Sequence, residues 1–467
     1  MSRSDALVLF GASGDLARKK LFSSLYRLAQ RGRLDVPVVG VAVTEWTNDE
    51  FREHARAAIT DTVRNADQDA VDELCARLTF VAGNYADTET FKRLHRELAQ
   101  VDASQPTFYL AIPPSFFPNV TEGLAHAGLH SNGRIVVEKP FGRDLASAVD
   151  LNRVLHEHFA ERDIYRIDHY LGKEAVEDLL IFRFANSFLE PIWNRNYIDH
   201  IQVTMSETFG VEGRGNFYES VGAIRDVVQN HMLQVVALLA MEPPVSPDAD
   251  ALRDEKVKVL RSTRPLEAGS VVRGQYDGYR SEQGVAPTST VETYAACRFE
   301  IDSWRWSGVP FYVRAGKGLA AKALEALIEL RAPPRMLFVD PNLPCPHPNV
   351  IRFRLGTGDG VTLTVQAKQP GRELVSRPVD LDVDFTASLG DRGEAYERLL
   401  DDALDGNARR FAGEDGVENA WRIVQPVLDD PGPIHHYQRG SWGPAEANRI
   451  LAGHHWHEPL PPSDGRS

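Results

Sequence analysis

The sequence has little cysteine and no long apolar run, and each scarcity excludes a class of protein. Cys75, Cys297 and Cys345 are odd in number, far apart and without metal-ligand spacing, which excludes a legible disulfide framework or cysteine zinc site. No apolar segment is long enough to span a bilayer. No secretory leader pattern follows Met1, so we expect a cytoplasmic protein.

The chain also lacks an excess of positive charge. It has 52 lysines and arginines against 66 acidic residues, a formal net charge of −14. This balance disfavours nucleic acid or an anionic membrane as the main partner. An anionic substrate must therefore be attracted by a local cluster of cations.

The first part of the chain has the pattern of a dinucleotide-binding fold. Residues 7–10 predict a buried strand, residues 11–17 (GASGDLA) a glycine turn, and the following apolar spacing a helix. Gly11 and Gly14 permit close approach to a pyrophosphate, although the spacing differs from G-x-G-x-x-G and a plain turn is an alternative. Further strands are expected at 36–43, 78–81, 108–112 and 134–138.

Strands that alternate with helices predict a parallel sheet, so we expect an α/β, Rossmann-like domain over residues 1–170. The texture then changes to period-2 segments without regular helical crossovers, together with an apolar helix from Gly222 to Met241. We expect an α+β domain over residues 171–467, built on a large, mainly antiparallel sheet with helices. The period-2 segments lie at 200–205, 309–314, 326–330, 350–355 and 360–365.

Residues 168–175 (DHYLGKEA) concentrate an acid, an imidazole and an ammonium in one short run. If the run is helical, His169 and Lys173 stand at i and i+4 and could hold one phosphate dianion together. An ordinary salt-bridged helix is the alternative, because isolated motifs often match by chance.

Five motifs together resemble the glucose-6-phosphate dehydrogenase family. They are GASGDLA (11–17), EKPFG (138–142), RIDHYLGKE (166–174), IRDVVQNH (224–231) and RAGK (314–317). The similarity continues through PIWN (191–194), GRG (213–215), RDEKVK (253–258) and AYERL (395–399), so it spans nearly the whole chain in order. The resemblance implies oxidation of glucose 6-phosphate at C1 to 6-phosphogluconolactone, with hydride transfer to NAD or NADP.

By this resemblance, His231 is the general base and Asp168 orients its imidazole. A neutral imidazole with a pKa near ~6.5 suits removal of the C1 hydroxyl proton at neutral pH. Taken alone, His231 lies in an apolar helical stripe and would more often be a core histidine. Asp168 taken alone could be a helix cap.

The resemblance also assigns substrate contacts. His169 and Lys173 match a phosphate-binding pair, Glu207 and Asp226 match sugar-hydroxyl acceptors, and Lys317 and Lys322 match basic contacts. Lys139 would touch both coenzyme and sugar, and Pro140 resembles a cis proline. Asp226 is expected roughly 140° round an α-helix from His231, so the two would meet only through bound sugar.

The residues assigned to the coenzyme lie in the glycine turn and at the strand ends. They are Gly11, Ser13, Gly14, Asp15, Leu16, Val43, Glu45, Tyr85, Pro113 and Lys139. NADP-using members carry an arginine where this chain has Val43, and Glu45 would repel a 2′-phosphate. The nearest arginines in sequence are Arg33 and Arg52. We hypothesise that NAD is used comparably to NADP or better.

Other departures from the family leave further expectations. Arg354 replaces an expected glutamine and could face the pocket or solvent. The region after Lys317 lacks most of the basic and aromatic residues that hold an additional structural NADP in animal relatives, so no second site is expected. We expect a homodimer, with a tetramer left open, and no metal requirement. His454, His455 and His457 are read as a loose tail cluster rather than metal ligands.

Two other readings remain open. A sugar or cyclitol oxidoreductase explains Gly11 to Pro140 but not the phosphate octet. A catalytically silent NAD(P)-binding subunit explains the dinucleotide pattern but has no need of a base such as His231.

Overall fold

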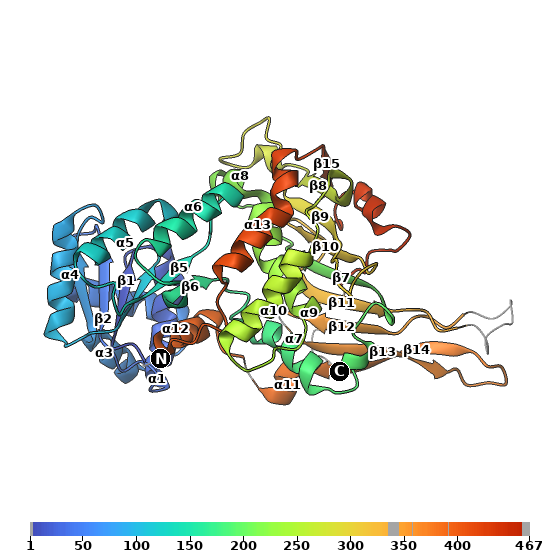
Figure 1. Cartoon of the computed structure of the whole chain (residues 1–467), viewed down its shortest axis with the longest axis horizontal. Coiled ribbons are helices and arrows are strands. Elements are labelled where there is room, and N and C mark those ends of the chain that lie inside the picture. Colours follow the sequence, from blue (N-terminus) through green and yellow to red (C-terminus); the bar gives the residue numbers. More distant parts are fainter. Residues whose placement is uncertain (1–2, 335–344, 357, 391, 460–467) are drawn as a thin grey trace. The chain divides into compact units, whose positions relative to one another are not determined.

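The computed structural model describes residues 3–334, 345–356, 358–390 and 392–459 (Figure 1). The chain divides into two compact units. The first comprises residues 1–174, 244–254 and 393–418, and the second comprises 175–243, 255–392 and 419–467. The first expected domain ended at residue 170, whereas the first unit runs to Glu174 and also takes in two later segments.

The first unit is built on a six-stranded parallel sheet in the order β3-β2-β1-β4-β5-β6. The strands are Ala6–Phe10 (β1), Val38–Ala42 (β2), Leu78–Ala82 (β3), Pro106–Leu110 (β4), Arg134–Glu138 (β5) and Ile164–Ile167 (β6). The five expected strands are confirmed, since short apolar runs are typical of strands covered on both faces. The sixth was not predicted because Arg166 interrupts its apolar run; Glu161 and Asn152 satisfy this buried guanidinium.

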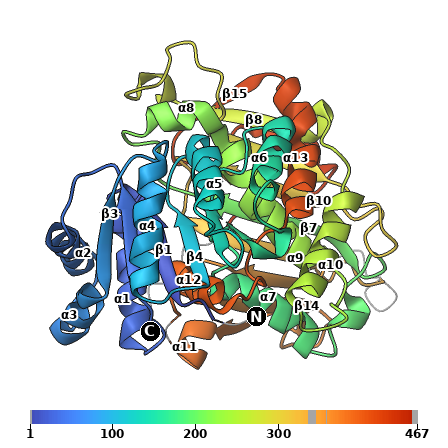
Figure 2. The same ribbon diagram turned by 60° about the vertical axis from the view of Figure 1, so that its left-hand side comes forward.

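Helices cover both faces of this sheet. One core joins the sheet to α1, α2, α3 and α12, and the other joins it to α4, α5 and α6. Figure 2 shows α4 and α5 lying over the sheet. The helices are Ala17–Leu21 (η1), Phe22–Gln30 (α1), Asn48–Thr62 (α2), Gln68–Ala76 (α3), Thr88–Gln100 (α4), Pro114–Phe116 (η2), Phe117–His126 (α5), Leu145–His156 (α6), Glu161–Asp163 (η3) and Ala395–Asp405 (α12).

The second unit is built on a nine-stranded sheet in the order β14-β13-β12-β11-β7-β10-β9-β8-β15. Within this sheet, as far as the structure describes it, only the pairs β7/β10 and β8/β15 are parallel, so the expected mainly antiparallel sheet is confirmed. The strands are Ile198–Ser206 (β7), Val271–Tyr276 (β8), Tyr294–Phe299 (β9), Phe311–Gly316 (β10), Ala323–Leu330 (β11), Val350–Arg354 (β12), Gly360–Lys368 (β13), Ser376–Asp384 (β14) and Ile434–Tyr437 (β15). The strands β8, β9, β14 and β15 were not predicted.

A buried helical segment packs on this sheet. The π-helix Ile224–Met232 (η5) contacts β9 and β10 and continues into Leu233–Ala240 (α9), where every residue is buried. The remaining helices are Glu174–Ala185 (α7), Glu190–Ile192 (η4), Gly215–Ala223 (α8), Ala249–Ser262 (α10), Ala268–Ser270 (η6), Tyr279–Ser281 (η7), Phe385–Leu389 (α11), Glu414–Asp429 (α13) and Ala445–Leu451 (η9). The expected helix over 222–241 is therefore present, but its first half is π-helical.

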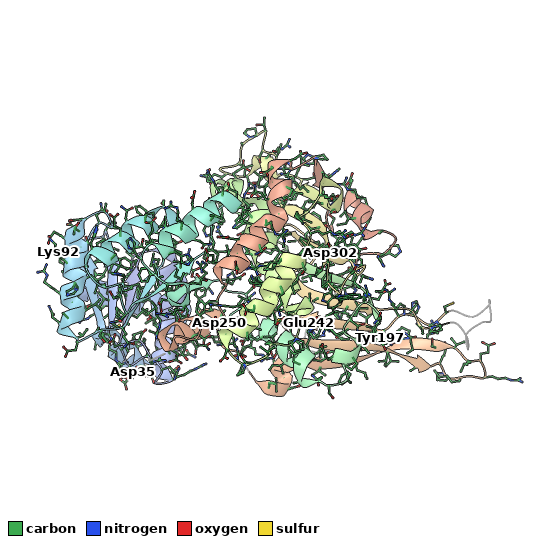
Figure 3. All side chains as sticks on the ribbon, viewed as in Figure 1. Asp35, Lys92, Tyr197, Glu242, Asp250 and Asp302 are labelled. Carbon is green, nitrogen blue, oxygen red and sulfur yellow. The ribbon has the colours of Figure 1, made fainter. Side chains whose placement is uncertain are left out.

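Two buried indole N–H groups cap the carboxyl end of α9. The indole nitrogens of Trp193 and Trp306 donate to the carbonyls of Leu239 and Ala240 at 2.8 and 2.7 Å. These bonds satisfy carbonyl groups that the end of a helix leaves without intrahelical partners. Glu242, labelled in Figure 3, follows the helix and forms an ion pair with Arg305. Among the described residues, no helix has both the length and the apolar character needed to cross a bilayer.

Candidate active site

The glycine turn after β1 packs tightly against the end of β4. Gly11 has a φ of +80°, and a Cβ at this position would lie 2.3 Å from the carbonyl oxygen of Ala111. Its amide donates to the phenol oxygen of Tyr85 at 3.0 Å, and the amide of Gly14 donates to the Gly11 carbonyl at 2.9 Å. The turn thus brings together three of the residues assigned to the coenzyme.

The other assigned residues of this unit lie in the same turn or at neighbouring strand ends. Ser13 accepts a hydrogen bond from the hydroxyl of Thr44 at 3.1 Å, which ties the turn to the segment after β2. Asp15 is exposed, and its hydrogen bond from Lys19 lowers the pKa of its carboxyl. Leu16 lies in the first helical residues after the turn, and Pro113 follows β4.

The peptide bond between Lys139 and Pro140 is cis, as the resemblance implied. Lys139 follows β5 directly, at the carboxyl edge of the sheet. Ligands of open parallel sheets bind at this edge.

The segment after β2 offers no arginine to a 2′-phosphate. Val43 is 63% exposed, and Glu45 is also exposed. Arg33 pairs with Asp401 and Asp405, whereas Arg52 donates to the Leu78 carbonyl at 3.1 Å. Both of the nearest arginines in sequence are therefore engaged elsewhere within the first unit.

Residues 168–173 of the octet form a turn, so the expectation of a helix with His169 and Lys173 at i and i+4 is wrong. Residues 168–173 connect β6 to α7 through successive turns, and α7 begins only at Glu174. The carboxylate of Asp168 accepts the amide of Tyr170 at 3.0 Å, and this local bond competes with helix formation. Lys173 Nζ lies 3.6 Å from the centre of the Tyr170 ring.

A buried acid network lies beside this turn. The phenols of Tyr109 and Tyr396 both donate to Glu138, the last residue of β5. Burial raises the pKa of Glu138 to about 7. The ring of His169 stacks on Tyr396 with a centroid distance of 6.3 Å. The sequence motifs contain Glu138 and Tyr396 but assign neither a role, and Tyr109 lies outside them.

In the second unit, Glu207, Lys317 and Lys322 lie at one end of the sheet. The register pairs Ser206 of β7 with Gly316 of β10 and with Ala323 of β11. Glu207 and Lys317 directly follow Ser206 and Gly316, and Lys322 directly precedes Ala323. Lys317 forms an ion pair with Glu207, whereas Lys322 is exposed. The sheet register therefore brings together residues that are over 100 positions apart.

Asp226 and His231 lie on η5, and the expected separation of roughly 140° between them is wrong. A π-helix closes its turn at i+5 rather than i+4, so residues five apart lie on the same side. The amide of Leu233 accordingly contacts the carbonyl of Val228, five residues earlier. Asp226 and His231 share one side of the segment, and π-helical turns are often found at functional sites.

Tyr218 of α8 is a further residue of this region that the sequence did not reveal. It is buried, and burial together with the Asp226 carboxylate raises the pKa of its phenol well above the ordinary value. Lys317 Nζ lies 5.4 Å from the centre of its ring and 5.1 Å from that of Phe209. No pattern in the sequence indicates that Tyr218 lies near Asp226 and Lys317, because most buried tyrosines are core residues.

Arg354 and two of the tail histidines have partners in the structure. Arg354 is partly exposed: its Nη1 lies 2.6 Å from Asp382, and its Nε donates to the Gly358 carbonyl. The tail histidines are not loose as a group. His454 Nε2 lies 2.8 Å from the Asp199 carboxylate, His457 Nε2 lies 3.0 Å from Glu325, and His455 is exposed.

His454 and Asp199 adjoin His200, but the hydrogen bonds there favour a proton network over a metal. The amide orientation of Gln202 is fixed because its oxygen accepts the His457 amide and its nitrogen donates to the His455 carbonyl. That nitrogen also lies 3.0 Å from His200 Nε2, which must then accept. The proton of His200 is therefore on Nδ1, directed at Asp199 3.1 Å away, and leaves no lone pair there for an ion.

Family models match both parts of the chain. A glucose-6-phosphate dehydrogenase NAD-binding domain matches residues 8–178, and a glucose-6-phosphate dehydrogenase C-terminal domain matches residues 180–457. Glucose-6-phosphate 1-dehydrogenase 1 of Mycobacterium bovis is 46% identical over 460 residues, which cover 98% of this chain and 97% of the relative. Glucose-6-phosphate 1-dehydrogenase of Aggregatibacter actinomycetemcomitans is 41% identical and covers 97% of both chains.

Two solved structures match nearly the whole chain. The crystal structure of glucose-6-phosphate 1-dehydrogenase from Mycobacterium avium has a TM-score of 0.92 at 46% identity and covers 99% of this chain and 100% of its own. A glucose-6-phosphate dehydrogenase in complex with glucose 6-phosphate has a TM-score of 0.91 at 35% identity, with 98% and 100% covered. The chain belongs to the glucose-6-phosphate dehydrogenase family and is an oxidoreductase with a nicotinamide-dinucleotide-binding domain.

Proposed function

We propose that the protein oxidises glucose 6-phosphate at C1 to 6-phosphogluconolactone and passes the hydride to a nicotinamide coenzyme. This is the first step of the oxidative pentose phosphate pathway. The observation that carries the proposal is the family match over both units, at 46% identity across 98% of the chain.

In this mechanism His231 is the general base, and Asp168 is its orienting group. As hydride leaves C1, His231 accepts the proton of the C1 hydroxyl, and the Asp168 carboxylate holds the other ring nitrogen and stabilises the imidazolium. His231 is buried on η5 and Asp168 is buried at the end of β6. A carboxylate that orients an imidazole fixes its tautomer, which makes the acceptor nitrogen available for the hydroxyl.

The substrate is bound through charge-assisted hydrogen bonds. His169 and Lys173, from one turn, are assigned to the phosphate, and Glu207 and Asp226 are assigned to the sugar hydroxyls. Lys139, Lys317 and Lys322 add positive charge around the substrate. A protein with a net charge of −14 needs such a cluster to attract a dianion.

We infer that NAD is used comparably to NADP or better. The coenzyme is assigned to the glycine turn and the ends of β2, β4 and β5, where main-chain amides and a short helix favour a pyrophosphate. Val43 and Glu45 stand where a 2′-phosphate would need a cation. Steady-state kinetics with both coenzymes test the assignment, and a large preference for NADP in kcat/KM removes it.

We also propose a cytoplasmic homodimer formed through the second unit, with one coenzyme bound per chain. The face of β14 that contains Val379, Leu381 and Val383 is exposed, and an exposed apolar sheet face usually marks an interaction site. Light scattering during gel filtration measures the mass directly; a monomer at micromolar concentration would contradict the dimer. No metal is assigned a role in the hydride step.

The decisive experiment is nicotinamide reduction on addition of glucose 6-phosphate, compared with unphosphorylated glucose and with His231→Asn. We expect turnover only with the phosphorylated sugar and a loss of about 10³-fold or more in kcat for the variant, from removal of the general base. Equal rates with glucose would favour a general sugar oxidoreductase. No turnover by the wild type would favour a silent NAD(P)-binding subunit.

A further inference from the structure

The π-helical segment η5 begins at a fixed point. Gly222, two residues before Ile224, has φ 65° and ψ 176°, which breaks the helical path at the end of α8. The next two amides bind a single residue: Ala223 N donates to the main-chain carbonyl of Glu292 at 2.9 Å, and Ile224 N donates to the Glu292 side chain Oε1 at 3.1 Å. Glu292 therefore receives the first amides of the segment that carries Asp226 and His231.

Glu292 is itself held rigidly by Arg273 of β8. Arg273 Nη2 and Nε donate to Glu292 Oε2 at 2.9 and 3.2 Å, and both side chains are buried. The remaining guanidinium donors reach the carbonyls of Thr290, Pro431 and Gly432. With its partners on both oxygens, the carboxylate has one defined position.

The approach of Gly222 to this carboxylate leaves no room for a side chain. A Cβ at position 222 would lie 2.5 Å from Oε1 and 2.9 Å from Cδ of Glu292. Its φ also lies in the left-handed region that favours glycine. The start of η5 therefore packs directly against the Glu292 carboxylate.

The residue after Glu292 contacts the other substrate-binding region. The carbonyl of Thr293 accepts the amide of Lys317 at 2.9 Å, and the hydroxyl of Tyr437 donates to the Lys317 carbonyl at 2.7 Å. The same Tyr437 hydroxyl lies 2.9 Å from that of Thr293. Residues 292–293 therefore tie the start of η5 to the strand end that contains Lys317.

We infer that Glu292, held by Arg273, is a positioning residue that sets the start of η5 and thereby the placement of Asp226 and His231 relative to Lys317. This rests on the proposed roles of those three residues. A π-helix has a wider turn than an α-helix and is rare, so a fixed start is needed to keep residues five apart on one side. Glu292 acts through the main chain and does not touch the substrate.

Two substitutions separate positioning from simple stabilisation. Glu292→Gln keeps an acceptor oxygen at the length that reaches Ile224 N but loses the charge that pairs with Arg273. Glu292→Asp keeps the charge but withdraws the oxygen by one methylene. A purely structural ion pair predicts that Asp is the milder change in both stability and activity. Positioning predicts that Gln retains more activity than Asp, whatever the order of their melting temperatures.

The experiment measures kcat, KM for glucose 6-phosphate, coenzyme dissociation constant and melting temperature for both variants. The matched control is Glu325→Gln, at a buried carboxylate of β11 in the sheet that contains Arg273. We expect Glu292→Asp to lose about 10²-fold in kcat, as small misplacements of reacting groups do, with coenzyme binding unchanged. We also expect its deuterium isotope effect with substrate labelled at C1 to rise, because hydride transfer becomes rate-limiting.

The inference is overturned if Glu292→Asp keeps wild-type kcat, or if Glu292→Gln is the less active of the two. The inference is also overturned if Glu325→Gln loses as much kcat as Glu292→Asp at the same melting temperature. His231→Asn is measured alongside: an active His231→Asn variant disproves the proposed base, whereas an inactive one beside an unimpaired Glu292→Asp disproves only the positioning role.

Discussion

Lys317 and Glu207 form an ion pair between the residues that follow two parallel strands, β10 and β7. Both side chains are partly buried, at 14% and 25% exposure, so solvent screens the pair less than a surface pair. A sugar phosphate that binds here would meet an ammonium and a carboxylate already held in place. Preorganised polar groups of this kind lower the cost of ordering a site on binding.

The first prediction concerns the charge of Lys317. We expect Lys317→Gln to raise KM for glucose 6-phosphate about 10- to 100-fold, because a hydrogen bond to a charged group contributes about 1.5–3 kcal/mol. KM for the coenzyme should be unchanged. Steady-state kinetics measure both. Lys92→Gln on α4, whose lysine is labelled in Figure 3, is the charge-matched control and should behave as wild type.

The second prediction concerns coenzyme choice. Val43→Arg places a guanidinium where a 2′-phosphate is expected, and we predict that the ratio of kcat/KM for NADP to that for NAD rises about 10- to 100-fold. Val101→Arg, at an exposed valine after α4, adds the same side chain elsewhere in the unit and should leave the ratio unchanged. An unchanged ratio in Val43→Arg would mean that Val43 does not face the ribose.

The third prediction concerns the glycine turn. Gly11→Ala combines a positive φ with a Cβ 2.3 Å from a carbonyl oxygen, whereas Gly32→Ala combines a similar φ with open space. The backbone cost of alanine in this region is about 1–2 kcal/mol at both sites. We expect the clash to add about 2 kcal/mol more at Gly11. Urea unfolding of both variants gives the difference in unfolding free energy. Equal losses of stability in the two variants would show that the clash at Gly11 adds no cost.

The fourth prediction concerns the buried Glu138. Its pKa is raised to about 7 in the folded chain, mainly by burial, from an ordinary value near 4.5. Between these pH values the unfolded state releases the proton while the folded state keeps it, so stability falls as pH rises. The loss amounts to about 3 kcal/mol by pH 8.

Glu138→Gln removes this titration. The free energy of unfolding of the variant should therefore fall less than that of the wild type between pH 5 and pH 8. Urea unfolding at pH 5, 6, 7 and 8 measures it. Glu53→Gln on α2, at an exposed carboxylate, is the control and should follow the wild-type curve. If the curve for Glu138→Gln runs parallel to the wild-type curve, Glu138 is already ionised near pH 5 in the folded protein.

Much of the fold was predictable because its signals are local. Buried strands such as 7–10 are continuous apolar runs, and the glycine turn after them follows at fixed spacing. β6 was missed because a buried Arg166, satisfied by Glu161 and Asn152, hides its apolar pattern. The strands β8 and β9 were missed since they mix Arg273, Gln275 and small residues with apolar ones.

The candidate site was predictable only as a set of residue types. The resemblance assigned Asp168, Glu207, Asp226, His231 and Lys317, but two geometric expectations drawn from the chain were wrong. Residues 168–173 form a turn, in which the Asp168 carboxylate accepts the amide of Tyr170. Asp226 and His231 share a side because η5 is π-helical. Neither departure has a signature in the residue spacing, since both depend on which partner each amide finds.

The sequence alone determined the dinucleotide turn, the class of each unit and the chemistry available to the site, because these depend on short-range spacing and on residue type. Only the tertiary structure decided how that chemistry is arranged. Sheet register placed Glu207 beside Lys317, 110 residues apart, and the buried pair of Arg273 and Glu292 fixed the start of the segment that contains His231. Such placements depend on contacts between distant parts of the chain, and no local pattern records them.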